Sequence, residues 1–209
     1  MSRTQHRLDP RRLLCRLAAL AAAILLVSGC YLPSEYNADL RITPDGRYNF
    51  RYEGFLTSTY LLQKMAEKID DEALAERVGV VERDLRRDRG FSEVQYVGNG
   101  KYKVKYERHG DIDEHGSFIF VRLNARIFTV QRGEDGVIKM FGAKPDAKTV
   151  EAVESAGLKT NGIVRLQTEA QVTDHNAHQV IPGEKPVYIW NLDNLRMPSP
   201  RLNFPIQRR

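Results

Sequence analysis

Cysteine is scarce in this chain: two of its 209 residues are cysteines, Cys15 and Cys30. Cys15 lies inside an N-terminal stretch with the composition of an export signal, and Cys30 lies at the end of that stretch. With Cys15 removed together with such a signal, one cysteine remains, so no disulfide can form within the rest of the chain. The domain that follows must therefore fold by apolar burial and hydrogen bonding alone.

The sequence also lacks the common signatures of catalysis. It contains no Gly-x-Ser-x-Gly elbow, no phosphate-binding loop and no His-Glu-x-x-His motif. Gly98-Asn99-Gly100 is typical of a tight hairpin turn and does not begin a nucleotide-binding fingerprint. No internal repeat or low-complexity block divides the chain. These absences predict a protein that is not an enzyme and that carries no cofactor.

An excess of basic charge disappears once the N-terminal stretch is set aside. The whole chain has a net charge of +5 and an isoelectric point near 9.2. Residues 1–29 hold five of the 32 basic and one of the 27 acidic side chains, which leaves 27 basic and 26 acidic ones and a net charge of +1. A nucleic-acid partner, which a strongly basic domain would favour, is therefore not expected.

The first 29 residues are typical of a bacterial signal peptide. A basic region comes first, an apolar run from Leu17 to Val27 follows, and the small residues Ser28 and Gly29 occupy the cleavage region. A helix of this run covers about 16 Å, roughly half of a hydrocarbon core, so a permanent spanning helix is disfavoured. The basic side chains of the first region are Arg3, Arg7, Arg11, Arg12 and Arg16.

The stretch Leu25-Leu26-Val27-Ser28-Gly29-Cys30 resembles the lipobox of bacterial lipoprotein precursors. The Cys30 thiol is the nucleophile that can form a thioether with a diacylglycerol, and two or more acyl chains hold a protein stably on a membrane. We therefore predict that Cys30 is lipidated and becomes the first residue of the mature protein. Two alternatives remain, an ordinary secretory signal with a coincidental cysteine and an uncleaved anchor.

The expected location follows from the signal. The pair Arg11-Arg12 leaves both the general secretory route and twin-arginine export open. The residue after the cysteine is Tyr31 and not Asp, which does not resemble an inner-membrane retention signal. We expect an exported protein, anchored by lipid to the outer face of the cell membrane, or to the outer membrane in a two-membrane bacterium.

Four segments are expected along the chain. They are a signal peptide at 1–29, the lipidated cysteine and a tether at 30–37, a folded domain at 38–195, and a loose proline-containing tail at 196–209. About 180 residues are enough for one domain with an apolar core.

Alternation of apolar and polar residues predicts strands over most of the domain. Ala38–Ile42 and Arg47–Tyr52 flank a turn and predict a hairpin, and Lys101–Glu107 alternates after the Gly98 turn. Phe118–Leu123 begins with apolar residues on both faces, so we expect it in the centre of a sheet. Gly162–Val172 alternates throughout, which is typical of a half-exposed antiparallel strand.

Helical periodicity replaces this alternation in two places. Thr57–Gly90 predicts two helices or one bent helix, with Asp70-Asp71-Glu72 as the N-cap and acidic first turn of the second. Pro145–Ala156 predicts a short helix. The expected fold class is α+β: mostly antiparallel β-sheet with two or three helices packed on one side, after an N-terminal signal peptide.

Three short motifs link the chain to a known family: Leu40-x-Ile42-x-x-Asp45-Gly46 soon after the cysteine, Gln171–Ala177, and Tyr188-Ile189-Trp190. Together with the helical insert, they resemble the LppM-like domain of bacterial, especially actinobacterial, lipoproteins. The resemblance implies a tethered α+β domain at the cell envelope, with lipid binding suggested for relatives. It brings no catalytic residue.

Two histidine clusters are the weak candidates for a metal site. In an extended segment His109, Asp111, Asp113 and His115 share a face and present nitrogen and oxygen ligands suited to zinc. The second cluster holds His175 and His178. Arg122 stands where a calcium loop starting at Asp111 needs its bidentate glutamate, which excludes an EF-hand. The alternative is that these residues form turns, and no metal is then expected.

Lipid contacts are the other candidate chemistry. Lys101, Lys103 and Lys105 share one strand face and are candidates for binding anionic headgroups; the alternative is that they protect an exposed sheet face from self-pairing. The arginines between Arg83 and Arg89 have the same two interpretations, with compensation of a helix dipole as the alternative. An apolar group, a candidate lipid-pocket lining or simply core, comprises Tyr60, Leu61, Leu62 and Met65.

These observations lead to one main hypothesis and two alternatives. The main hypothesis is a membrane-anchored, non-catalytic lipoprotein that binds lipid, glycolipid or a protein partner at the cell envelope, with covalent diacylglycerol and acyl chains on Cys30. The first alternative is a structural or assembly factor that docks on another envelope protein. The second is a metal-dependent hydrolase that uses the His109/His115 and His175/His178 clusters.

Overall fold

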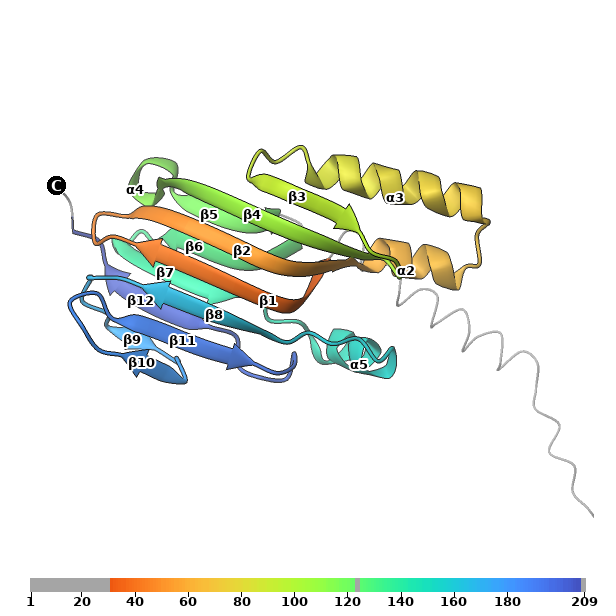
Figure 1. Ribbon diagram of the computed structural model, residues 1–209. Helices are drawn as coiled ribbons and strands as arrows, with labels where there is room; N and C mark the ends of the chain where they lie inside the picture. The colour runs from red at the N-terminus through yellow and green to blue at the C-terminus, as the bar shows by residue number, and fades with distance from the viewer. Residues whose placement is uncertain (1–30, 123–124, 208–209) are drawn as a thin grey trace, which may run out of the picture.

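Two β-sheets stacked face to face form the body of the molecule (Figure 1). The computed structural model describes residues 31–122 and 125–207. In spatial order the large sheet contains β10 (Gln179–Ile181), β11 (Val187–Leu192), β8 (Gly162–Gln167), β1 (Tyr31–Ile42), β2 (Arg47–Ser58), β4 (Lys101–Asp111) and β3 (Phe91–Tyr96). The small sheet contains β5 (Ser117–Arg122), β6 (Ala125–Arg132), β7 (Val137–Gly142), β12 (Arg201–Pro205) and β9 (Asp174–His175).

The core lies between the two sheets because each long strand turns alternate side chains inward. β1, β2 and β4 bury every second residue over most of their length. Phe50 of the large sheet lies 5.1 Å from Phe118 and 6.0 Å from Phe128 of the small sheet, measured between ring centroids. Fully burying such a side chain contributes about 1.5–3 kcal/mol, so this aromatic layer joins the sheets firmly.

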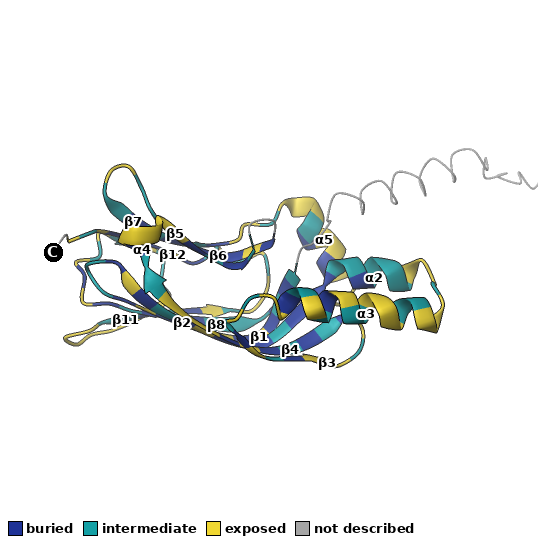
Figure 2. Cartoon of the chain, turned by 90° about the horizontal axis from the view of Figure 1, so that it is seen from above, coloured by how far each residue is buried: buried dark blue, intermediate teal, exposed yellow. Residues whose placement is uncertain are grey.

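Helices gather mostly at one end of the sheets (Figure 2). There α2 (Thr59–Ala66), α3 (Asp71–Leu85) and α5 (Ala147–Ser155) lie together, while the single turn α4 (Ile112–His115) lies near the opposite end. The second predicted helix begins as expected: the Asp70 carboxylate accepts a hydrogen bond of 2.7 Å from the Ala73 N–H.

The predicted α+β class is therefore confirmed in its coarse form, and its arrangement is corrected. The sheets are mostly antiparallel, but there are two of them. The described residues form four helices, and α2, α3 and α5 lie at one end of the sheets instead of covering one side. No helix in residues 31–122 or 125–207 is long and apolar enough to cross a bilayer.

The predicted tether and tail are both wrong at the level of secondary structure. Tyr31 already belongs to β1, where it pairs with Ser58, so no spacer separates Cys30 from the fold. Pro33 is tolerated because β8 joins β1 only from Tyr36 onward, which leaves one edge of β1 open at the proline. In the tail, β12 pairs with both β7 and β9.

Two strand predictions are also corrected. The strand at Phe118–Leu123 was expected to be central, but β5 is an edge of the small sheet; it is apolar on both faces because a bulge between Phe120 and Val121 buries Val121 as well. The strand at Gly162–Val172 ends at Gln167; it is antiparallel to β11, as predicted, but parallel to its other neighbour, β1. Buried and exposed residues alternate along this strand because the outer face of the large sheet is open to solvent. The alternation does not depend on the direction of the strand.

Candidate functional site

The predicted attachment residue Cys30 and the cleavage-region residues Ser28 and Gly29 lie outside the described residues. The next residue, Tyr31, is held in place by its surroundings. Burial is the main reason that its pKa rises to about 12, while Arg122 opposes this rise. Arg122 in turn donates a hydrogen bond of 2.7 Å to the Asp84 carboxylate of α3. The chain thus enters the fold where both sheets and the helical end meet.

The three candidate headgroup lysines line the outer face of β4, as predicted, but each has an acidic neighbour. Lys101 Nζ lies 2.8 Å from Glu35, and Lys103 Nζ lies 3.4 Å from Glu93. Lys105 Nζ lies 3.4 Å from Glu53 of β2, the other neighbouring strand of β4. Exposed pairs of this kind contribute about 0–1 kcal/mol. The outer face of β4 is thus matched in charge, and headgroup binding by these lysines stays a prediction.

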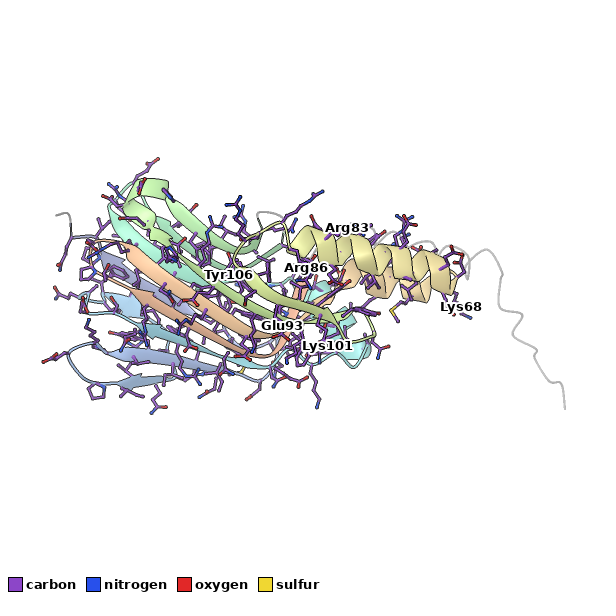
Figure 3. All side chains as sticks on the ribbon, turned by 45° about the horizontal axis from the view of Figure 1, so that its top comes forward. Lys68, Arg83, Arg86, Glu93, Lys101 and Tyr106 are labelled. Carbon is purple, nitrogen blue, oxygen red and sulfur yellow. The ribbon has the colours of Figure 1, made fainter. Side chains whose placement is uncertain are left out.

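The arginines at the end of α3 make contacts of the same kind. Arg86 donates hydrogen bonds of 3.1 and 2.9 Å to Glu82 and one of 2.5 Å to the Val94 carbonyl, which ties α3 to β3. Figure 3 shows Arg83 and Arg86 along α3 and Glu93 on the neighbouring hairpin. Arg86 therefore has a structural role in docking the helix.

The acidic residues of the first histidine cluster make capping and ion-pair contacts. The Asp111 carboxylate accepts hydrogen bonds from the backbone N–H groups of Asp113 and Glu114 and so caps α4. Asp113 is paired with Arg132. Among the described residues, no group of three or more His, Cys, Asp or Glu side chains is arranged to hold a metal ion. The turn interpretation fits these contacts.

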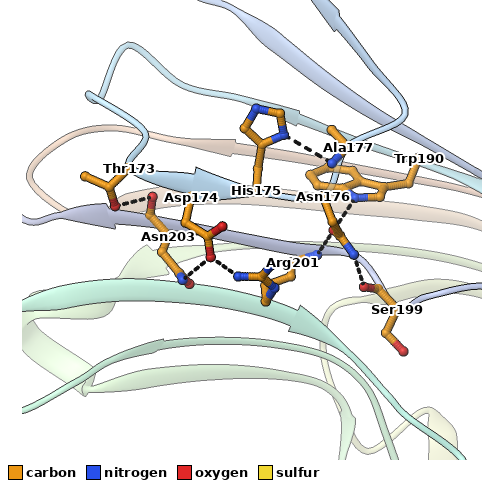
Figure 4. Close-up of polar contacts among 9 residues, drawn as sticks. All are labelled: Thr173, Asp174, His175, Asn176, Ala177, Trp190, Ser199, Arg201 and Asn203. Carbon is orange, nitrogen blue, oxygen red and sulfur yellow. Dashed lines mark hydrogen bonds and ion pairs between the residues drawn. The ribbon is translucent and has the colours of Figure 1, made fainter.

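The second cluster belongs to a hydrogen-bonded link between the sheets (Figure 4). Asn176 Oδ1 accepts 2.8 Å and 2.7 Å hydrogen bonds from Trp190 Nε1 and the Arg201 N–H, and Asn176 Nδ2 donates to the Ser199 carbonyl at 2.8 Å. His175 Nδ1 accepts a hydrogen bond from the Ala177 N–H. The motif therefore connects β11 of the large sheet to β12 of the small sheet and is structural.

Sequence reasoning missed an arginine-rich groove on the outer face of the large sheet. Its volume is about 330 Å³, and Arg51 and Arg165 border it. Arg51 Nε lies 3.0 Å from Glu107 Oε1, and Arg165 Nη1 lies 3.4 Å from Asp39 Oδ1. The outward positions were readable from strand alternation, but the pairing of β1 with β8 across more than a hundred residues was not. The lining is Asp39, Leu40, Arg41, Asn49, Arg51, Arg165, Gln167 and Val187.

A second groove, of about 510 Å³, lies where α3 leads into β3. Asp88 lies 3.6 Å from Arg108 there and accepts a hydrogen bond of 3.1 Å from the Tyr106 hydroxyl. Both grooves open to solvent, and charged side chains make up half of the first lining and most of the second. The full lining of this second groove is Arg87, Asp88, Arg89, Gly90, Glu107, Arg108 and His109.

Leu61, one of the residues proposed to line a lipid pocket, is fully buried in the core.

Comparison with known proteins adds a distant likeness among solved structures. No family model matches the chain, and no curated protein matches it. Among solved structures, the chain is similar to the NMR structure of the folded domain of LppM from Mycobacterium tuberculosis, with 12% sequence identity and a TM-score of 0.43. The match covers 85% of this chain and 92% of that domain. A likeness of this size assigns no anchor, ligand or activity to the chain.

Proposed function

We propose that this chain is a lipid-anchored protein of a bacterial envelope, and that its domain acts by binding and not by catalysis. The observation that carries the proposal is the junction at Cys30. The predicted export signal ends at this cysteine in the sequence, and β1 starts at the very next residue, Tyr31. Acyl chains on Cys30 would therefore hold the domain directly on the membrane surface.

Binding to lipid, glycolipid or a protein partner is proposed to occur at the surface of the domain. The space between the sheets is filled by aromatic and aliphatic side chains. Two depressions on the surface of the described residues are solvent-open grooves that contain arginines. Guanidinium groups bind phosphate and carboxylate oxygens in a fixed geometry, so such grooves suit anionic groups of a lipid or of a protein.

A role as an assembly factor on another envelope protein is the second candidate function. The observation that favours it is the edge strand β10, where Val180 and Ile181 are 39% and 46% exposed. An exposed apolar edge strand is a template for pairing with a strand of another protein. Crosslinking in intact membranes distinguishes the two candidates, since a specific protein captured from β10 favours the assembly role.

Metabolic labelling tests the proposed anchor. Cells that produce the full chain are grown with a labelled fatty acid, beside cells that produce Cys30→Ala and the matched control Cys15→Ala. The wild type and Cys15→Ala should carry the label, whereas Cys30→Ala should stay unprocessed and unlabelled. Equal processing of Cys30→Ala would leave an ordinary secretory signal and a protein without a lipid anchor.

A further inference from the structure

The end of the molecule next to the anchor carries apolar side chains that the core does not take up. Leu62, Met65 and Ala66 follow the spacing of one helical face on α2, and Ile69 follows in the connection to α3. Within the described residues, Leu62, Met65 and Ile69 are half-buried yet neither belong to the core cluster nor pack against it. Val97, at the end of β3, is 46% exposed.

These side chains come from two segments that the backbone holds together. The Ser58 N–H donates a hydrogen bond of 2.8 Å to the Gly100 carbonyl, which joins the start of α2 to the β3–β4 turn. A methyl group built on Gly100 would lie 3.4 Å from Leu62 Cδ2. Ser58 is also the residue that pairs with Tyr31. The turn that follows Val97, the start of α2 and the entry of the chain therefore lie side by side.

Charged groups around these apolar side chains carry both signs. Lys64 Nζ lies 2.7 Å from Glu67, and Lys101 Nζ lies 2.8 Å from Glu35. Lys68 lies near the tip of the helical hairpin (Figure 3), and the acidic first turn of α3, Asp71 and Glu72, follows soon after it in the chain. Because the charges nearly balance, apolar burial and not attraction to anionic lipid must drive any contact with a membrane.

We propose that Leu62, Met65, Ala66, Ile69 and Val97, here called the anchor-side surface, lie in the headgroup region of the bilayer that holds Cys30. This inference rests on the proposed lipid anchor. One residue spans at most about 3.6 Å, so acyl chains on Cys30 keep Tyr31 and its partner Ser58 close to the interface. An apolar face held there can bury itself about 5–10 Å into the boundary between headgroups and acyl chains.

Single cysteines can test this placement, because the acylated mature chain has no other thiol. Full-length Val97→Cys and Met65→Cys are produced in a lipidating host, purified in acylated form, labelled with bimane, and placed in phosphatidylcholine vesicles that contain lipids brominated near the headgroup. Val180→Cys is the matched control, since Val180 is similarly exposed but lies on the edge strand β10. Mass spectrometry of each sample confirms the acyl chains.

Bromolipid should quench the labels at positions 97 and 65 at least about threefold more than the label at 180, since an interfacial apolar face sits only about 5–10 Å deep. The ratio should not change when phosphatidylglycerol replaces part of the phosphatidylcholine. Equal quenching at all three positions in acylated protein would overturn the inference and leave the anchor intact. Shielding of positions 97 and 65 from water without bromolipid quenching would indicate a second copy or another protein there and would also overturn it. Samples without acyl chains would instead contradict the proposed anchor.

Discussion

The two-sheet body and the α2–α3 hairpin are stabilised in different ways. In the body, aromatic rings from both sheets pack against one another, and Asn176 links β11 to β12 with side-chain hydrogen bonds. The hairpin buries few residues, chiefly Leu61, Val81 and Leu85, and depends on caps and a few polar contacts. One such contact is the 2.8 Å hydrogen bond from the Tyr102 hydroxyl to the Val78 carbonyl.

This difference indicates a division of roles within one domain. The body presents charge-matched outer strands, whereas the hairpin carries apolar side chains beside the predicted anchor and has fewer buried contacts. Regions that contact partners are often those with fewer buried contacts. Hydrogen exchange should therefore be slowest in β1, β2 and β4 and faster in α2 and α3.

The largest expected loss of stability comes from removing one ring of the aromatic layer between the sheets. Phe50→Ala removes a ring that contacts both sheets, and a change of this kind costs about 3–5 kcal/mol. The matched control is Phe55→Ala on the outer face of the same strand. The Phe55 ring is half-buried, and Lys101 Nζ lies 4.1 Å from its centroid. Urea denaturation measures both. A loss at Phe50 no larger than the loss at Phe55 would contradict the shared core.

A smaller effect is expected at the link between the sheets. Asn176→Ala leaves the Trp190 Nε1–H without its acceptor, and an unsatisfied buried donor costs about 1–3 kcal/mol. Trp190 fluorescence should report the change in its surroundings. The exposed Asn191→Ala serves as the control on β11, and equal stability of the two variants would show that the Asn176 network does not hold the sheets together.

The hairpin should respond to the loss of its cap more locally. Asp70→Ala removes the acceptor for the Ala73 N–H, which costs about 1 kcal/mol. Hydrogen exchange should accelerate in the first turns of α3 and remain unchanged in β2 and β4. Asp71→Ala, one residue further on, is the control. Acceleration throughout the body would mean that hairpin and body unfold as one unit.

The smallest effects are expected on the two exposed surfaces. Lys103→Gln and Val97→Ser should each change the free energy of unfolding by no more than about 0.5 kcal/mol. Bromolipid quenching of a bimane label at position 65 in the acylated protein should separate them, because Val97→Ser weakens membrane contact at the anchor-side surface and Lys103→Gln does not. A loss of membrane contact in Lys103→Gln but not in Val97→Ser would indicate that the lysines of β4 bind the lipid headgroups.

Local features of the fold were predictable from the sequence. Alternation located β2 and β4, and the Asp70 cap located the start of α3, because neighbouring residues alone decide these patterns. β12 was missed because Pro198, Pro200 and Pro205 give this segment the look of a loose tail, although Leu202 and Phe204 alternate and are buried. A short alternating run becomes a strand when distant partners cover it, and those partners were not visible in the sequence.

For the candidate surface sites, too, local placement could be predicted from the sequence and distant partners could not. The lysines at 101, 103 and 105 were correctly placed on one face, yet their partners Glu35, Glu53 and Glu93 come from other strands. The spacing of His175 and His178 suggests a ligand set, whereas Asn176 between them forms the central contact. Residue type and spacing suggested chemistry, but strand pairing decided whether the groups met.

Mass spectrometry of the mature N-terminus tests the central claim most directly. Trypsin should release Cys30–Arg41, since no Lys or Arg lies between Cys30 and Arg41. In protein purified from membranes, this peptide should begin at Cys30 and carry the mass of a thioether-linked diacylglycerol. An unmodified Cys30, or a peptide that begins before it, would contradict the anchor on which the proposed orientation of the domain depends.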